Sequence, residues 1–308
     1  MSPTPRVTSL LSLASALIAG AAAGCIDPAP EDGPPDGYVR FEPTPIPVAA
    51  GASGQWVQYV AGPVAQDLDV VDIIGEQGPG GHHAVLYATP DVEPVGTTRD
   101  WRAVDQVTDR FLGGVGGEGG EAIRLPEGAV FRVPAGDALY INTHYLNATD
   151  EDEVGTTRLD VKLEPASPDR KAVTLFTNVT VDFDLPAEHA TSREITCTVE
   201  DDLDLVMYTN HMHDYGVSTR TTITPPGGEP TVLKDDPVWS PEWQSNPNFA
   251  RATVAQPLHL ARGTVVTTTC AWNNTTSRDL TFPDEMCLFL SFQLGSRDLA
   301  CVDGTWTN

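Results

Sequence analysis

The chain has 308 residues, of which 43 are acidic and 18 are basic, giving a formal net charge of −25. This charge argues against nucleic acid and anionic membrane surfaces as partners. The 27 glycines and 26 prolines exclude a helical bundle or coiled coil, in which both residues are rare. A β-rich protein with many turns is expected, and the length suits one large or two medium domains.

The first residues have the pattern of an export leader. Arg6 precedes the apolar run 10–18, which is too short to span a bilayer. Small residues directly before Cys25 resemble a bacterial lipobox, in which the cysteine becomes the acylated N-terminus. We therefore expect a lipoprotein signal peptide over residues 1–24, with an ordinary signal peptide as the alternative. Localisation at the outer membrane follows, on its periplasmic face or the cell surface, with the lipid as the only membrane contact.

Residues 25–47 are rich in proline among acidic and small residues, which predicts an extended tether without a core of its own. After Cys25, four cysteines remain, and all lie in the second half of the chain. They are Cys197, Cys270, Cys287 and Cys301. An even number in an exported protein implies disulfides, and the spacing alone leaves three connectivities open.

Segments rich in Val, Thr, Leu and Tyr recur between Gly, Pro, Asp and Asn, as β-strands do. They are 55–60, 70–74, 84–88, 129–133, 139–145, 158–163, 173–181, 194–199, 205–211, 218–224, 258–260, 264–271 and 286–293. They predict an all-β fold of two tandem antiparallel β-sandwiches, jelly-roll-like, at 48–165 and 170–308. Residues 114–119 fit GxGxxG, but no helix pattern follows, so we interpret 113–120 as a Gly-rich loop.

Five of the seven histidines fall in three short segments. His211 and His213 are two apart on a predicted strand, so both imidazoles face the same side and can meet one ion. His82 and His83 are adjacent and would face opposite sides of a regular strand. The glycines just before them can supply the irregular backbone that brings both to one metal, and His144 can complete a three-imidazole set.

The other two histidines, His189 and His259, stand alone and are interpreted as surface or core residues. Imidazole clusters suit zinc, copper, iron or nickel, and a thioether ligand favours copper. Met212 faces away from its neighbouring histidines, and Met207 lies about 13 Å from His211 along a strand. Met286, next to Cys287, is the remaining thioether candidate.

In order and approximate spacing, these residues resemble the copper type II, ascorbate-dependent monooxygenases, which include the peptidylglycine α-hydroxylating and dopamine β-monooxygenases. That family has an adjacent His pair and a later His on its first domain, then an HxH pair and a Met on its second. The resemblance covers roughly residues 50–303. It includes the segment Asp284-Glu285-Met286-Cys287.

The resemblance implies two coppers per chain. His82, His83 and His144 would hold an electron-transfer copper, and His211, His213 and Met286 a catalytic copper that activates O₂ to hydroxylate a substrate C–H bond. Ascorbate or a similar reductant would recharge both across a water-filled cleft between the domains. The family's disulfides imply the pairs Cys197–Cys301 and Cys270–Cys287.

Two features depart from the family. No cysteine lies between 26 and 196, so the disulfides of the family's first domain are missing. Thr209, Leu288 and Leu290 occupy positions where the peptidylglycine enzymes carry Arg, Asn and Tyr, of which the Arg and Tyr help to hold the peptide carboxylate. The resemblance therefore predicts a small-molecule substrate other than a peptidylglycine, more apolar or neutral.

Two other functions remain open. A non-enzymatic copper-binding lipoprotein on the same scaffold would consume O₂ with ascorbate but release no hydroxylated product. A zinc-binding structural or adhesion module would use Met286 only as a core residue. In each case we expect a monomer, and the aromatic loop 239–249 is a further candidate for lining a substrate cleft.

Overall fold

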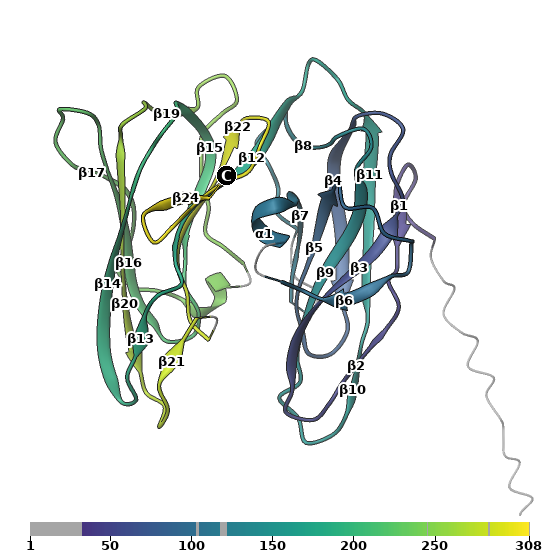
Figure 1. Cartoon of the computed structure of the whole chain (residues 1–308), viewed down its shortest axis with the longest axis horizontal. Helices are drawn as coiled ribbons and strands as arrows, with labels where there is room; N and C mark the ends of the chain where they lie inside the picture. The colour runs from purple at the N-terminus through teal and green to yellow at the C-terminus, as the bar shows by residue number, and fades with distance from the viewer. Residues whose placement is uncertain (1–32, 103–104, 118–121, 245, 283, 308) are drawn as a thin grey trace, which may run out of the picture. The chain divides into compact units, whose positions relative to one another are not determined.

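In the computed structural model, residues 33–308 are described except 103–104, 118–121, 245, 283 and 308. The predicted signal peptide and Cys25 lie outside these residues. Strands make up nearly all the regular structure, beside one α-helix, α1 (Asp105–Thr108), and one 3-10 turn, η1 (Pro241–Gln244), in the described part (Figure 1). The all-β prediction is confirmed.

The first half of the chain contributes two facing sheets. One has the order β6-β3-β9-β5-β7, and the other starts β1-β11-β4-β8. The strands are β1 (Val39–Phe41), β3 (Ser53–Ala61), β4 (Leu68–Gln77), β5 (Gly81–Thr89), β6 (Thr98–Asp100), β7 (Arg110–Gly116), β8 (Ala129–Val133), β9 (Ala138–Leu146) and β11 (Thr157–Pro165). A two-stranded sheet pairs β2 (Ile46–Val48) with β10 (Glu153–Gly155).

The second half repeats this arrangement. A four-stranded sheet β14-β20-β16-β17 faces the sheet β12-β22-β15-β18. The strands are β12 (Lys171–Thr180), β14 (His189–Thr198), β15 (Leu203–His211), β16 (Gly216–Thr224), β17 (Thr231–Asp236), β18 (Ala250–Arg251), β19 (Leu258–Leu260), β20 (Val265–Asn274), β22 (Cys287–Leu294), β23 (Leu299–Val302) and β24 (Thr305–Thr307). A short pair joins β13 (Asp184–Leu185) to β21 (Leu280–Thr281).

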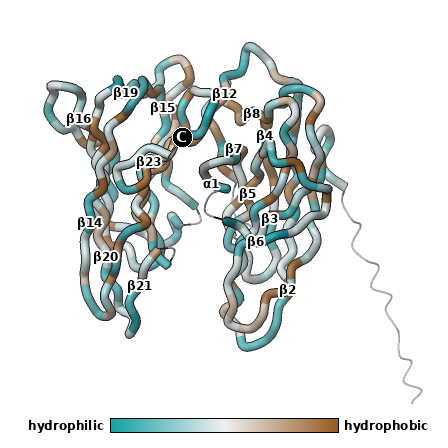
Figure 2. The backbone as a smooth tube through the Cα atoms, viewed as in Figure 1, coloured by the Kyte–Doolittle hydropathy of each residue, from teal (hydrophilic) through white to brown (hydrophobic). Residues whose placement is uncertain are grey.

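The two halves share a sheet and a core. Strand β8 pairs with β12 in parallel, so an eleven-stranded sheet runs from the first half into the second. One hydrophobic cluster contains Phe111 and Phe131 from the first half and Phe292 from the second, with ring centroids 5.4–5.7 Å apart. Figure 2 shows hydrophobic segments along strands such as β5 and β20. Burial of aromatic rings across the junction fixes the relative placement of the two halves.

Buried carboxylates also tie the halves together. Asp298 accepts hydrogen bonds from the backbone N–H of Phe111, at 2.9 Å, and of Leu175, at 2.7 Å. Asp69 is fully buried and pairs with Arg132 at 2.7 Å and with Arg170 at 2.9 Å. These contacts leave each buried charge paired or hydrogen-bonded on both sides of the junction.

The expected tether differs from the structure in its second part. Strands β1 and β2 lie within the predicted 25–47 segment and its edge, and both pair with strands of the first sandwich. Phe41, Ile46 and Val48 are buried, and the last two pack on Tyr145. Pro47 is tolerated because β2 belongs to a two-stranded sheet and so is an edge strand.

The interpretation of 113–120 as a Gly-rich loop is wrong for residues 113–116, which belong to β7, and residues 118–120 lie outside the described part of the chain. A Cβ on Gly114 would lie 2.3 Å from the Ala84 carbonyl oxygen of β5, so only glycine fits this close strand contact. Gly113 has a φ of +99°, which side chains other than glycine's rarely adopt. The glycines here permit a strand rather than break one.

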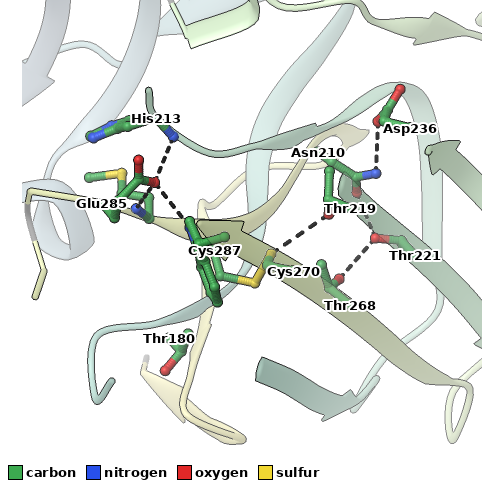
Figure 3. The surroundings of a disulfide bond; sticks show 12 residues. Thr180, Asn210, His213, Thr219, Thr221, Asp236, Thr268, Cys270, Glu285 and Cys287 are labelled. Carbon is green, nitrogen blue, oxygen red and sulfur yellow. Dashed lines mark hydrogen bonds between the residues drawn. A yellow bond between two sulfur atoms is a disulfide. The ribbon is translucent and has the colours of Figure 1, made fainter. Parts of the chain in front are cut away.

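Both disulfides expected from the resemblance are present. Cys197–Cys301 joins β14 to β23, and Cys270–Cys287, drawn in Figure 3, joins β20 to β22. Each disulfide therefore links the two facing sheets of the second half. Among the described residues, no helix has the length and apolar character needed to cross a bilayer.

Candidate metal centres

His82 and His83 lie near the start of β5, and His144 lies opposite them on β9. The register between the two strands shifts between Gly81 and His83, so that His82 is the extra residue of a bulge and His83 pairs with His144. Gly80, at a φ of +73°, turns the chain into this bulge. The adjacent histidines therefore do not alternate, and both point to the same side as His144.

The three imidazoles of this first cluster can meet one ion. Their ring centroids are 5.3 Å (His82–His83), 4.6 Å (His82–His144) and 5.1 Å (His83–His144) apart. One nitrogen from each ring lies within 4.8 Å of the other two. His82 Nδ1 and His83 Nδ1 are 3.2 Å apart, close to the roughly 3.3 Å between two nitrogens bound at about 2.0 Å in a tetrahedral site.

Partners on the far nitrogens select Nδ1 as the ligand atom. Asn142 Oδ1 lies 3.2 Å from His83 Nε2, and Ser53 Oγ lies 3.1 Å from His144 Nε2. Each can accept the Nε2 proton, which leaves the Nδ1 lone pair free. His144 Nδ1 is buried without a hydrogen-bond partner. Such an orphaned acceptor is costly unless a cation binds it, so the donor set fits copper.

Burial keeps these rings neutral. It lowers the pKa of His83 to about 4 and that of His144 to about 2, and the neighbouring imidazoles act in the same direction. Burial also lowers the pKa of His82. Neutral imidazole is the form that ligates metals, so the cluster stays ready for an ion well below neutral pH.

His211 ends β15, and His213 follows two residues later. Their ring centroids are 5.3 Å apart, so the structure brings this predicted pair together. Burial lowers the pKa of His211 well below its usual value. His213 Nδ1 lies 3.1 Å from the Asp284 carbonyl oxygen, so Nε2 is the nitrogen that remains for a metal. Trp239 donates its indole N–H to the His213 carbonyl at 2.9 Å.

Glu285 organises this second cluster, although sequence reasoning gave it no role. Its fully buried carboxylate accepts from the backbone N–H of His213 at 3.0 Å, of Tyr215 at 2.6 Å and of Met286 at 3.3 Å. It also accepts from the indole N–H of Trp272 at 3.0 Å. Figure 3 shows Glu285 between His213 and the disulfide. One side chain thus fixes the HxH loop relative to the methionine segment.

Burial raises the pKa of Glu285, and the backbone donors of Tyr215 and His213 oppose that shift. The sequence signal for this role is the acidic residue directly before Met286. A buried carboxylate that accepts from several N–H groups commonly orders a loop. The disulfide Cys270–Cys287 holds the same segment from the other side.

A buried polar network holds the end of β15 in place. Asn210, next to His211, donates to Asp236 at 3.0 Å and accepts from Thr221 at 2.6 Å. Thr221 in turn contacts Thr268 at 2.9 Å (Figure 3). Every member of this network has a partner, so it can fix one position of the strand end.

The two clusters are close together. The ring centroids of His82 and His213 lie 6.4 Å apart, which contradicts the expected water-filled cleft between the sites. The shared sheet and core described above allow this approach, because they join the halves directly.

Gln244 of η1 crosses from the second half to the first cluster and contacts His82 Nε2 with its amide. Its Oε1 is buried without a partner. Turning the Gln244 side-chain amide by 180° exchanges its O and N positions. Gln244 Oε1 then accepts the proton of His82 Nε2, which leaves His82 Nδ1 free on the side of His83. Sequence reasoning singled out the surrounding loop but not this residue.

The remaining sequence candidates have other places. His259 pairs with Asp204 at 2.8 Å on the surface, and His189 contacts its own loop at the Ala187 carbonyl. Met207 and Met212 are fully buried core residues. In the aromatic loop 239–249, Trp239 and Trp243 pack against each other in a core cluster, whereas Phe249 lines a cavity, so the expectation that this loop lines a cleft holds for Phe249 and not for the tryptophans.

Residues 171–296 match the protein family described as copper type II ascorbate-dependent monooxygenase, C-terminal domain. This match supports membership of the copper type II ascorbate-dependent monooxygenase family through the second half of the chain. The matched range includes His211, His213 and Met286, and the first cluster lies before it. The match to this domain supports a monooxygenase-like function that depends on copper and ascorbate.

No curated protein matches the chain. Among solved structures, the chain is similar to the major capsid protein P2 from bacteriophage PM2, at 8% identity and a TM-score of 0.40, over 84% of this chain and 98% of that one.

Proposed function

We propose that the chain is a copper-dependent monooxygenase that hydroxylates a C–H bond with O₂ and a one-electron reductant. The observation that carries this proposal is that one ring nitrogen from each of His82, His83 and His144 lies within 4.8 Å of the other two, while His144 Nδ1 is buried without a partner. The second cluster belongs to a domain whose family is copper- and ascorbate-dependent. Two coppers per chain are proposed, one at each cluster.

Each cluster is proposed to hold one copper with a different set of ligands. His82, His83 and His144 would hold one copper through three neutral imidazoles, a set that supports both of its oxidation states. His211, His213 and Met286 would hold the other through two imidazoles and a weak thioether, which leaves positions open. Copper bound there supplies O₂ activation and one-electron chemistry. Glu285 holds the HxH loop and the methionine segment in register, and Asn142 orients His83.

The proposed substrate is a neutral or apolar small molecule rather than a peptidylglycine. Thr209 is buried and contacts Asn248 at 3.2 Å, and Leu288 is buried. Leu290 packs against the main core cluster. These positions therefore offer no charged group for a peptide carboxylate.

We also propose export as a monomeric lipoprotein anchored through Cys25 at the outer membrane. Two disulfides support the export part of this proposal, because such bonds persist in oxidising compartments.

Copper stoichiometry with Cu(II) EPR on the lipid-free protein tests the function, alongside His83→Ala and His213→Ala. Two coppers per chain, with each variant losing a different one, are expected. One copper or none would overturn the paired-site proposal. Product analysis under ascorbate then separates the enzyme from a copper-binding lipoprotein, because O₂ consumption without any hydroxylated product across a substrate panel would favour the latter.

A further inference from the structure

Gln244 ends the 3-10 turn η1 in the second half, yet its side-chain amide contacts His82 of the first cluster. As placed, the amide nitrogen faces His82 Nε2, and Gln244 Oε1 is buried without a hydrogen-bond partner among the described residues. A buried amide oxygen without a partner costs free energy. The contact therefore calls for an arrangement in which this oxygen is used.

The turn that carries Gln244 is held by the second half on both sides. Before it, Trp239 donates its indole N–H to the His213 carbonyl at 2.9 Å. After it, Asn248 donates to the buried carboxylate of Asp236 at 3.0 Å. With the backbone fixed in this way, an exchange of the amide oxygen and nitrogen of Gln244 needs only a rotation about its last side-chain bond, which has a broad torsional preference.

The neighbouring ring decides which nitrogen of His82 carries the proton. Asn142 donates to the Trp56 carbonyl with its amide nitrogen, at 3.4 Å, so its Oδ1 faces His83 Nε2 at 3.2 Å and accepts the proton there. His83 Nδ1 is therefore an acceptor, and it lies 3.2 Å from His82 Nδ1. Without an ion between them, two lone pairs would repel at this distance. In the metal-free protein His82 consequently carries its proton on Nδ1 and donates it to His83.

Two hydrogen-bond arrangements follow from these positions. In the first, His82 donates from Nδ1 to His83 and accepts at Nε2 from the Gln244 amide nitrogen, with the atoms as they are placed. In the second, the amide is turned over, Gln244 Oε1 accepts from His82 Nε2, and His82 Nδ1 offers its lone pair to an ion. A glutamine side chain serves both arrangements because its amide can donate and accept.

We propose that Gln244 is a positioning residue that sets the tautomer of His82, and that turning its amide converts a hydrogen-bonded pair of rings into a three-imidazole copper site. This inference rests on the proposed function. The exchange leaves the ring neutral, because one proton leaves Nδ1 to water and one is taken up at Nε2. The second half thereby takes part in the first copper centre, since it supplies the outer partner of one ligand.

Glutamate and leucine at position 244 should change copper affinity in opposite directions. Gln244→Glu accepts but cannot donate, so it removes the first arrangement and strengthens the bond to the Nε2 proton. The first cluster should then bind copper about tenfold more tightly. Gln244→Leu supports neither arrangement and should bind about tenfold more weakly. A side chain that only fills space would not give this reversal of sign.

Chelator competition measures these affinities in a His213→Ala background, which leaves the first cluster to load and retains the backbone carbonyl that holds Trp239. Asn246→Asp adds the same charge as Gln244→Glu at an exposed position two residues away, and it should bind as the parent does. Parent affinity in both Gln244 variants would overturn the proposal. An equal gain in Gln244→Glu and Asn246→Asp would also overturn it, because charge alone would then explain the effect.

NMR of protein with nitrogen-labelled histidine reads the tautomer directly, with His82→Gln identifying the signals of His82. In the metal-free parent, His82 should carry its proton on Nδ1, and addition of Cu(I) should move the proton to Nε2. Metal-free Gln244→Glu should already show the Nε2 form. An Nε2 proton in the metal-free parent that copper leaves unchanged would overturn the proposal.

The metal-free measurement keeps this inference separate from the proposed function. Failure of the parent to load copper at the first cluster would contradict the proposed function, whereas the His82 tautomers of the parent and Gln244→Glu would still show whether Gln244 sets the proton. Copper loading with a His82 tautomer that does not depend on Gln244 would overturn this inference alone. With His213 intact, each Gln244 variant should retain copper at the second cluster, which confirms that the fold is preserved.

Discussion

Asn142 Oδ1 lies 3.2 Å from His83 Nε2, on the side of the ring that faces away from the cluster. Both residues belong to adjacent strands, and Asn142 is buried at 3% exposure, so the contact is shielded from water. The amide therefore sets the tautomer and the orientation of a proposed ligand from outside the metal site.

Replacing Asn142 by Leu should weaken copper binding at the first cluster about tenfold, because the Nε2 proton of His83 loses its acceptor. Competition titration with a copper chelator measures the affinity. Ser53→Ala tests the equivalent contact at His144 and should have a smaller effect, because Ser53 is exposed and water can replace it. An unchanged affinity in Asn142→Leu would contradict the assignment of Nδ1 as the ligand atom.

Glu285→Gln should release copper from the second cluster selectively. The amide keeps one acceptor oxygen but places an NH₂ group against N–H donors, so His213 and Met286 lose their common anchor. We expect a loss of copper affinity of about 10- to 100-fold at this cluster and a fall in unfolding free energy of about 1–3 kcal/mol. EPR and denaturant unfolding measure the two effects. Glu242→Gln, on the exposed start of η1, serves as the control.

The metal-free protein should lose stability as the pH falls from about 6.5 to about 4. In the unfolded chain the histidines take up protons near pH 6.5, whereas burial lowers the pKa of folded His83 to about 4 and that of His144 to about 2. The unfolded state therefore binds more protons in this window, and stability is fully present above it and declines on acidification.

Denaturant unfolding at a series of pH values measures this slope. His83 alone should contribute about 2 kcal/mol or more across the window. His144→Phe should flatten the slope, whereas His189→Gln at the exposed start of β14 should leave it unchanged. A parent protein whose stability is independent of pH over this range would show that the rings are solvated in solution.

The two disulfides should differ in what their removal costs. Cys197–Cys301 closes a separation of 104 residues and Cys270–Cys287 one of 17, so chain entropy predicts losses of about 4.7 and about 3 kcal/mol. Replacing the first pair by alanine should lower stability without changing the copper count. Replacing the second pair should also weaken the second cluster, because Cys287 directly follows Met286. Equal effects on copper from both pairs would contradict this division.

Much of the fold could be predicted from the sequence, because alternating β-branched residues mark strands directly. The predicted segment 129–133 coincides with β8, and 258–260 with β19. Strands β1 and β2 were missed because they are short and lie in a proline-rich stretch that resembles a tether. Strand β7 was missed because its glycines serve a close backbone contact that only the three-dimensional structure reveals.

The spacing of the histidines was enough to choose the candidate ligands. The residues that surround and orient those ligands could not be predicted from the sequence. The bulge at His82 was expected from the glycines before it, since local geometry follows from local sequence. Gln244 and Glu285 could not be assigned roles, because each acts on residues far away in the chain or through backbone groups. The 6.4 Å separation of His82 and His213 depends on how the halves pack, which no motif encodes.

Strand β8 pairs in parallel with β12, and Phe111, Phe131 and Phe292 pack together across the same junction. The two halves are therefore expected to depend on each other for folding. Cutting the chain between residues 165 and 170 would expose these rings and an unpaired strand edge on both pieces. Neither piece is then expected to remain soluble alone, since such surfaces associate with other chains. The intact chain should lose both sandwiches in one cooperative transition, and a copper centre in either would resist heat only as long as the other sandwich remains folded.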